Sequence, residues 1–204
     1  MNDLTPRSGG KKTYHHGDLK AALVAAGMEM LEEGGLESLS LRGIAARVGV
    51  SHAAPKNHFA GLGGLLPAIA AEGFRRHAAA MRGTLDEAAT PEARLAAASQ
   101  GYVDFALAHP ALFRLMFSPT LCDHSDPALS EAGSDSFTVL AGIAEGLDWR
   151  PIDGGEPTPR QTQIMLWSTV HGYATLAISG QLALGDGGAP PFPATAILPA
   201  FAYR

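Results

Sequence analysis

Hydrogen-bonding side chains gather in one short stretch of the chain, Leu41 to Phe59, which reads LRGIAARVGVSHAAPKNHF. In this stretch Asn57 could pair with adenine, Lys56 with guanine or a phosphate, and the methyl group of Ala53 could contact thymine. The other polar residues of the set are Ser51, His52 and His58. Each has a plain alternative, which is a solvated surface position or, for His58, a place in the core.

The same stretch breaks one helix and begins another within a few residues. Ser40 has the side chain of a helix N-cap, and Gly49 ends the helix that follows. Ser51 is expected to cap a further helix that reaches about residue 59, although Pro55 predicts a late or irregular start. Two short helices joined by a tight turn form a helix-turn-helix, whose second helix can enter a major groove.

The rest of the chain also has helical patterns. Apolar residues recur at spacings of three and four, and Thr90-Pro91 and Thr158-Pro159 are typical helix starts. The expected helices are 17–33, 40–49, 51–59, 65–85, 90–109, 111–117, 126–147, 158–185 and 194–203. Glycine-rich loops are expected at 61–64 and 150–157. No segment with the period of a strand competes, so the predicted fold class is all-α with about nine helices.

Composition narrows the class of protein further. The chain of 204 residues is 46% hydrophobic and 17% charged, which is typical of a folded domain. Its one cysteine, Cys122, excludes an intrachain disulfide and favours a reducing, cytoplasmic compartment. The first twelve residues lack the apolar core of a signal peptide. Residues 161–185 carry no charge and could span a bilayer by length, but their Gln, Ser, Thr and His side chains favour a helix buried in protein.

The charge of the chain is distributed unevenly. The formal net charge is −5, with residues 1–82 at +3 and residues 83–204 at −8. The basic charge of residues 1–82 permits a polyanionic partner for that part of the chain, although an ordinary solvated surface could carry the same net charge.

Several motifs together resemble one known family. Residues 13–59, from TYHHGDLK to KNHF, look like the DNA-binding domain of TetR/AcrR-type transcriptional regulators. Further on, AHPALFRLMF is similar to a short motif of the regulatory domain in that family. The segment WSTVHGYATL, with Trp167, His171 and Gly172, resembles the Trp-His-Gly signature of one C-terminal subclass. The resemblance covers residues 13–204.

The resemblance implies three parts and a set of DNA contacts. The parts are a flexible basic arm at 1–14, a helix-turn-helix DNA-binding domain at 15–62 and a ligand-binding and dimerisation domain at 63–204. Arg42 would contact a phosphate or a base edge and Ser40 the backbone. The basic residues of the arm that could follow the DNA are Lys11 and Lys12. Lys56 stands where the family usually has tyrosine, and Leu62 where it usually has lysine, so DNA affinity is in question.

The resemblance also implies a pocket for a small inducer in the second domain. The candidate lining residues are Tyr102, Phe105, Phe113, Met116, Phe117, Phe137, Trp167 and His171. The alternative for each one is an ordinary core position. His171 is polar in an otherwise uncharged helix, so it must find a hydrogen bond to a ligand, a second subunit or a backbone carbonyl.

A two-fold dimer is the expected assembly. The long uncharged helix and the C-terminal helix would pair with their copies, while burial in the monomer core is the alternative. The candidate interface residues are Ala174, Ile178, Leu182, Ile197 and Phe201. Two-fold symmetry would set two recognition helices about 34 Å apart on a palindromic site.

Enzymatic and metal-dependent functions are not favoured. The loop CDHSD, from Cys122 to Asp126, offers a thiol, an imidazole and carboxylates, but no second cluster completes a metal site. No phosphate loop, nucleophile elbow or carboxylate pair is present, so no catalytic residue, metal or cofactor is expected. The sequence thus predicts a ligand-released, DNA-binding repressor. The alternative is an all-α ligand-binding protein with weak or lost DNA binding.

Overall fold

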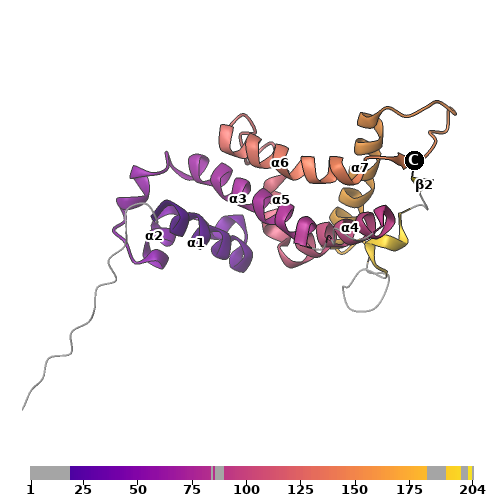
Figure 1. Ribbon diagram of the computed structural model, residues 1–204. Helices are drawn as coiled ribbons and strands as arrows, with labels where there is room; N and C mark the ends of the chain where they lie inside the picture. The colour runs from indigo at the N-terminus through magenta and orange to yellow at the C-terminus, as the bar shows by residue number, and fades with distance from the viewer. Residues whose placement is uncertain (1–18, 84, 86–89, 183–191, 199–201, 204) are drawn as a thin grey trace, which may run out of the picture.

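A computed structural model describes residues 19–83, 85, 90–182, 192–198 and 202–203 (Figure 1). The α-helices in it are α1 (Leu19–Gly34), α2 (Leu41–Val48), α3 (Leu62–Gly83), α4 (Pro91–Ala108), α5 (Pro110–Met116), α6 (Pro127–Ile143) and α7 (Pro159–Ile178). Short 3-10 helices are η1 (Leu36–Ser38), η2 (Ala54–Asn57) and η3 (Ala194–Ala196). Two-residue strands β1 (Leu147–Asp148) and β2 (Ala202–Tyr203) pair antiparallel. The all-α class is therefore confirmed, with seven α-helices in the described residues instead of about nine.

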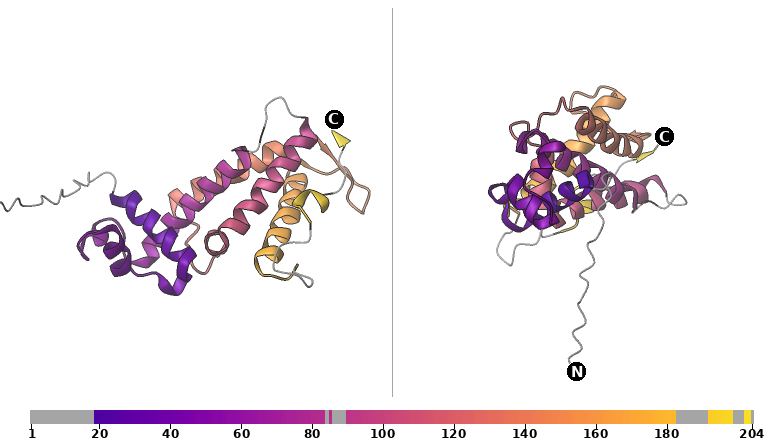
Figure 2. Two further views of the ribbon diagram at one scale, coloured as in Figure 1. Left: turned by 90° about the horizontal axis from the view of Figure 1, so that it is seen from below. Right: turned by 90° about the vertical axis from the view of Figure 1, so that its left-hand side faces the viewer.

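The elements form an elongated molecule with two different ends (Figures 1 and 2). Helices α1 and α2 and the short η2 lie at one end, whereas α7 and the strand pair lie at the other. Helix α3 begins beside η2 and continues into the second end, where it packs along α6 and also contacts α4 and α5. Helix α3 thus extends through both ends of the molecule. No described helix is long and apolar enough to cross a membrane.

Side-chain caps begin the helices where the sequence predicts them. Ser40 accepts a hydrogen bond of 3.0 Å from the amide of Gly43. Thr90, Asp126 and Thr158 each cap a helix whose first residue is proline. Because proline has no amide hydrogen to lose and its φ suits the first turn, these boundaries are well defined.

The expected helix at 51–59 is much shorter in the structure. Only Ala54–Asn57 is helical, in 3-10 form, and its N-cap position is Ala53, so the prediction that Ser51 caps a helix is wrong. Pro55 explains the difference. Its ring excludes the carbonyl position four residues earlier, and its buried side chain anchors the turn to the core. A normal α-helical start at Ser51 is therefore prevented.

Four other elements differ from the sequence-based expectation. Helix α3 begins at Leu62, so only Gly61, with φ of 82°, belongs to the expected loop at 61–64. Helix α6 ends at Ile143 instead of 147, and α7 ends at Ile178 instead of 185, with left-handed Gly146 and Gly180 soon after. The expected helix at 194–203 is present only as η3, followed by β2. For α6 and α7, a glycine at positive φ follows the helix end, which apolar periodicity alone does not indicate.

Two glycines allow unusually close packing between helices of the second end. A Cβ atom added to Gly101 of α4 would lie 2.7 Å from the carbonyl oxygen of Ala80 in α3. A Cβ atom added to Gly73 of α3 would lie 2.7 Å from the sulfur of Met116 in α5. Helices α3, α4 and α5 consequently form one closely packed unit.

Candidate functional site

The polar residues predicted from the sequence lie together on the surface at the α1–α2 end. Ser51, His52, Ala53, Lys56 and Asn57 are exposed, and His58 is half-buried. Ser40 and Arg42, at the start of α2, are also exposed. Lys11 and Lys12 lie outside the described residues. The structure therefore brings the described members of this set to one exposed end of the molecule.

The basic side chains at this end differ in their pairing. Arg47 donates two hydrogen bonds to the carboxylate of Glu33, at 2.6 and 2.7 Å, and this bonding raises the pKa of Arg47. The bonds attach α2 to α1. In contrast, Arg42 and Lys56 have no hydrogen-bond or ion-pair partner among the described residues. These two cations are therefore available to an external anion.

The second end contains a cavity of about 190 Å³ with mostly aromatic walls. It is lined by Phe74, His77, Met81, Tyr102, Phe117, His124, Gly133, Ser136, Phe137, Leu140 and Trp167. Four of the eight candidate ligand-binding residues line it: Tyr102, Phe117, Phe137 and Trp167. Phe105, Phe113 and Met116 are instead buried in the surrounding core, and His171 lies behind the wall, against Phe113 and Phe117.

A hydrogen-bond chain fixes the orientation of three of these side chains. The indole of Trp167 donates to the hydroxyl oxygen of Tyr102 at 3.3 Å, and the same hydroxyl lies 2.8 Å from Nδ1 of His171. Since an indole only donates, the hydroxyl hydrogen of Tyr102 points to His171. Burial raises the pKa of Tyr102 and lowers that of His171, so both groups stay neutral at pH 7. The hydrogen bond of His171 is therefore made to the side chain of Tyr102, a partner that the sequence analysis did not propose.

His77 is a polar residue of the cavity wall that the sequence reasoning missed. Its side chain is 1% exposed, and its Nδ1 lies 2.9 Å from the hydroxyl oxygen of Ser136. Its Nε2 is buried and has no hydrogen-bond partner among the described residues. Burial, followed by the proximity of His171, lowers the pKa of His77 to about 3. The available signal was its helical spacing from Phe74 and Met81, three residues after one and four before the other.

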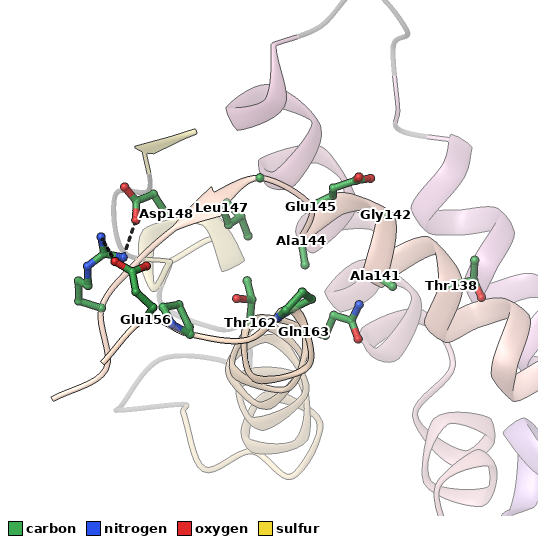
Figure 3. Close-up of a pocket in the computed structure, with 14 residues that line it drawn as sticks. Thr138, Ala141, Gly142, Ala144, Glu145, Leu147, Asp148, Glu156, Thr162 and Gln163 are labelled. Atoms are coloured by element: carbon green, nitrogen blue, oxygen red, sulfur yellow. Dashed lines mark hydrogen bonds and ion pairs between the residues drawn. The ribbon is translucent and has the colours of Figure 1, made fainter. Parts of the chain in front are cut away.

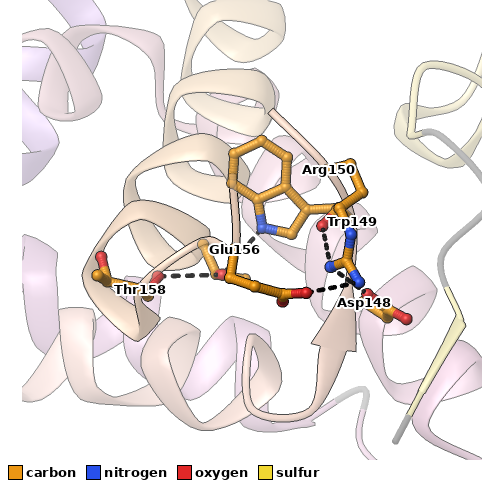
Figure 4. Close-up of polar contacts among 6 residues, drawn as sticks. Asp148, Trp149, Arg150, Glu156 and Thr158 are labelled. Atoms are coloured by element: carbon orange, nitrogen blue, oxygen red, sulfur yellow. Dashed lines mark hydrogen bonds and ion pairs between the residues drawn. The ribbon is translucent and has the colours of Figure 1, made fainter. Parts of the chain in front are cut away.

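A larger hollow of about 550 Å³ lies between the end of α6 and the start of α7 (Figure 3). Among its charged residues, Arg150 forms ion pairs with Asp148 and Glu156, at 3.0 Å each (Figure 4). Beside them, the indole of Trp149 donates to the hydroxyl oxygen of Thr162 at 2.9 Å. Seven of the fourteen residues that line the larger hollow are exposed to solvent, whereas only His124 is exposed among the eleven that line the smaller cavity. The smaller cavity is therefore the better candidate ligand site.

Comparison with known proteins identifies the family. Residues 95–192 match the tetracyclin repressor-like C-terminal domain. A protein of unknown function from Rhodococcus sp. RHA1 is 34% identical, with 92% of this chain and 93% of that chain covered at a TM-score of 0.72. The chain belongs to the TetR family. Members of this family are non-enzymatic transcriptional regulators that bind DNA, so the chain is a regulator and not an enzyme.

Solved structures of other regulators share the fold at lower identity. A possible TetR-family regulator from Streptomyces coelicolor A3(2) is 22% identical, covering 84% of this chain and 76% of that one at a TM-score of 0.56. A transcriptional regulator from Rhodococcus sp. Rha1 is also 22% identical, covering 87% and 90% at a TM-score of 0.63. Among curated proteins, none matches the chain significantly.

The CDHSD loop of this TetR-family chain does not assemble a metal site. The thiol of Cys122 is buried, and burial raises its pKa to about 11. The carboxylate of Asp123 accepts hydrogen bonds from the amide and hydroxyl of Ser125, which lower its pKa. Within the described ranges, no three His, Cys, Asp or Glu residues are placed to hold a metal ion.

The candidate dimer residues of this TetR-family chain have different environments. Ala174 is fully buried within the single chain, because that face of α7 packs on α4, so it is not available to a second subunit here. Ile178, Leu182 and Ile197 are half-buried against the core, and Phe201 lies outside the described residues. The exposed apolar residues of α7 are instead Ile164 and Leu176, which apolar periodicity did not separate from the buried face.

Proposed function

We propose that this TetR-family chain is a cytoplasmic, homodimeric repressor that binds a palindromic operator and is released by a small, largely apolar ligand. The observation that carries the proposal is the course of α3. This helix begins beside the exposed η2 segment and carries His77 in the wall of the cavity. One rigid element therefore connects a surface suited to DNA with a site suited to a ligand.

The DNA-binding part of the proposal comprises residues 15–62, preceded by the basic arm at 1–14. Asn57 and Lys56, exposed on η2, would contact bases and phosphates, and the unpaired Arg42 would bind a phosphate. Because η2 is a short 3-10 turn, the contact surface comprises the exposed residues of the segment 51–58 and not one face of a long recognition helix.

The ligand-binding part comprises residues 63–204, with the aromatic cavity as its site. A second connection to the DNA-binding end runs through Glu32 of α1. Its carboxylate accepts hydrogen bonds from the amides of Leu112, at 2.9 Å, and Ala111, at 3.4 Å, at the start of α5. Helix α5 leads directly to Phe117 in the cavity wall. A ligand that moves this wall would thereby shift α1, with a typical coupling of about 1–3 kcal/mol between sites.

The dimer in this proposal forms through the uncharged exposed face of α7, which includes Ile164, Ser168 and Leu176. Two-fold symmetry would place the two η2 segments on half-sites roughly 34 Å apart. A ligand that changes this separation would release an operator that requires both contacts together.

Binding of DNA selected from a random duplex pool tests the proposal. We expect a palindromic consensus and an affinity that falls steeply with salt. Lys56→Ala and Arg42→Ala should weaken binding to every duplex, whereas Asn57→Ala should relax specificity at one position, at a cost of roughly 1–3 kcal/mol. Arg94→Ala, which removes an exposed charge from α4, is the matched control.

Two results would contradict the proposal. One is the absence of any salt-sensitive duplex binding, which would favour the alternative of an all-α ligand-binding protein with weak or lost DNA binding. The other is an equal effect of Lys56→Ala and Arg94→Ala on the dissociation constant, which would remove η2 from the DNA interface.

A further inference from the structure

The lining of the aromatic cavity has a buried side and an outer side. The buried residues carry no group that is ionised at pH 7, because burial lowers the pKa of His77 to about 3 and raises that of Tyr102. These buried residues are Phe74, His77, Met81, Tyr102, Ser136 and Leu140. The other lining residues are half-buried or exposed, and they are Phe117, His124, Gly133, Phe137 and Trp167. The mouth of the cavity therefore lies on the side of these five residues.

Two exposed nitrogen-containing side chains stand at this mouth. Among the eleven described residues that line the cavity, His124 alone is exposed, and it lies in the loop before α6. The guanidinium carbon of Arg160, in the first turn of α7, lies 4.9 Å from the centre of the Phe137 ring. Because Phe137 belongs to the outer side of the lining, Arg160 holds a positive charge beside the mouth.

The charge of Arg160 differs from that of its neighbour on the same loop. Arg150 forms ion pairs with Asp148 and Glu156. The side chain of Arg160 forms no ion pair or hydrogen bond with any residue that the structure describes, and its recorded contact is the ring of Phe137. A guanidinium on an aromatic ring keeps its full charge, so Arg160 is available to an anion.

The acidic side chains of the CDHSD loop already have partners. The carboxylate of Asp123 accepts hydrogen bonds from Ser125, and that of Asp126 accepts one from the amide of Leu129. A cationic group of a ligand would therefore meet the charge of Arg160 and carboxylates that are bonded elsewhere. A carboxylate group would instead pair with the guanidinium, whose planar set of donors matches two carboxylate oxygens. The mouth thus favours a carboxylate.

The interior of the cavity favours an aromatic body for the same ligand. Its volume is about 190 Å³, and an apolar cavity of about 150 Å³ holds benzene. Aromatic rings pack well against one another edge-to-face or with an offset, and four such rings of the wall belong to Phe74, Phe117, Phe137 and Trp167. A carboxylate among the buried residues would lose its hydration and gain no opposite charge. A short alkyl linker must therefore carry it from the ring to the mouth.

We propose that the cavity binds an arylalkyl carboxylate, with its ring between the aromatic side chains and its carboxylate at the mouth, paired with Arg160 and hydrogen-bonded to His124. This inference rests on the proposed function, in which the cavity is the ligand site. It assigns the charge of the ligand and the two residues that select it.

Calorimetry on the full chain, without DNA, tests the assignment with matched probes. The probes are 3-phenylpropanoate, 3-phenylpropanamide, which has nearly the same shape and no charge, and benzoate, whose carboxylate is attached directly to the ring. We expect 3-phenylpropanoate to bind about fivefold or more tightly than either of the others, because a charge-assisted pair is stronger than a neutral one.

Variants at the mouth identify the residues responsible. In Arg160→Gln, the preference for 3-phenylpropanoate over the amide should fall to less than about twofold, with the affinity for the amide unchanged. His124→Ala should reduce the affinity for 3-phenylpropanoate by roughly two- to threefold through the loss of one hydrogen bond. Arg94→Gln, which removes an exposed charge from α4, is the control and should keep the full preference.

A measurement on the unchanged protein guards against a variant that fails to fold. The affinity for 3-phenylpropanoate should fall as sodium chloride is raised, because salt screens an exposed ion pair, whereas the affinity for the amide should not. Equal affinity for these two probes, an equal response to salt, or a preference that survives in Arg160→Gln would each overturn the assignment. An unchanged affinity in His124→Ala would remove His124 from the site.

The proposed function can fail separately from this assignment. Selective binding of 3-phenylpropanoate without release of operator DNA would keep the site and contradict the ligand-released repressor. Operator release by a different ligand that does not compete with 3-phenylpropanoate would keep the repressor and overturn the assignment of this cavity.

Discussion

The two ends of the molecule use their polar residues in opposite ways. At the α1–α2 end, Lys56, Asn57 and Arg42 are exposed, and the local fold does not depend on them. At the other end, His77, Tyr102 and Ser136 are buried. The hydroxyl groups of Tyr102 and Ser136 have hydrogen-bond partners, whereas Nε2 of His77 has none among the described residues. A residue of the exposed end can therefore change function alone, whereas a residue of the buried end changes stability and function together.

The largest expected effect tests this contrast with one buried and one exposed residue. Phe113 is 2% exposed and packs against Phe117 and His171, so Phe113→Ala should reduce the free energy of unfolding by about 3–5 kcal/mol. Lys56→Ala should change it by less than about 0.5 kcal/mol, because no described residue depends on that side chain. Urea denaturation followed by circular dichroism measures both. Similar losses in the two variants would break the contrast.

The close approach of α4 to α3 gives the next largest effect. Gly101→Ala would place a methyl group 2.7 Å from the Ala80 carbonyl, and the backbone must shift, at a cost of about 1–3 kcal/mol. Gly142→Ala is the control, because it lies in α6 with no atom within 4 Å of the added carbon. That change should stabilise the protein by up to about 1 kcal/mol through helix propensity. Thermal unfolding measures both variants. A shift of Tm in the same direction for the two would contradict the close approach of α4 to α3 at Gly101.

The dependence of stability on pH sharpens the contrast at the buried end. The pKa of His77 is lowered to about 3 from an ordinary 6.5, so the unfolded chain binds a proton that the folded chain refuses between these values. The contribution of the neutral ring to the free energy of unfolding is fully present above pH 6.5 and is lost as pH falls towards 3. At pH 5 the loss is about 2 kcal/mol. The loss from pH 7 to pH 5 should be smaller in His77→Phe by about that amount. Parallel curves for the two proteins would show that the ring takes up a proton in the fold.

The smallest effect concerns the link between the ends. Glu32→Gln keeps the shape of the side chain but removes the charge at the start of α5, so unfolding should become easier by about 0.3–1 kcal/mol. Glu37→Gln, on exposed η1, is the control and should have no measurable effect. If Glu32 also transmits the ligand signal, its variant should release DNA less completely at saturating ligand. Unchanged stability and release would leave α3 as the sole connection.

Much of the fold could be predicted because its helix boundaries are encoded locally. The caps at Ser40, Thr90 and Thr158 depend on residues three or four positions apart, which a sequence displays directly. The failures came where tertiary context decides. Pro55 could begin a helix or anchor a turn to the core, and Gly63 and Gly64 could form a loop or a first helical turn. The neighbouring residues in the sequence do not distinguish these alternatives.

The candidate sites were predictable to different extents for the same reason. The expected exposure of Ser51, His52, Ala53, Lys56 and Asn57 follows from a short amphipathic pattern, and the structure has these five residues exposed. Which aromatic residues line a cavity depends on how four helices meet, so Phe105 and Phe113 could not be distinguished from Phe117 and Phe137. His77 was missed because its partner, Ser136, is 59 residues away along the chain.

The positions of the two tryptophans allow fluorescence to report on the cavity. The indole of Trp167 is bonded to Tyr102 in the cavity wall, whereas that of Trp149 is bonded to Thr162 beside the larger hollow. Since the chain has no further tryptophan, Trp149→Phe would leave a single fluorophore in contact with the cavity. Its emission would then report in real time, and without any added label, when the cavity is occupied.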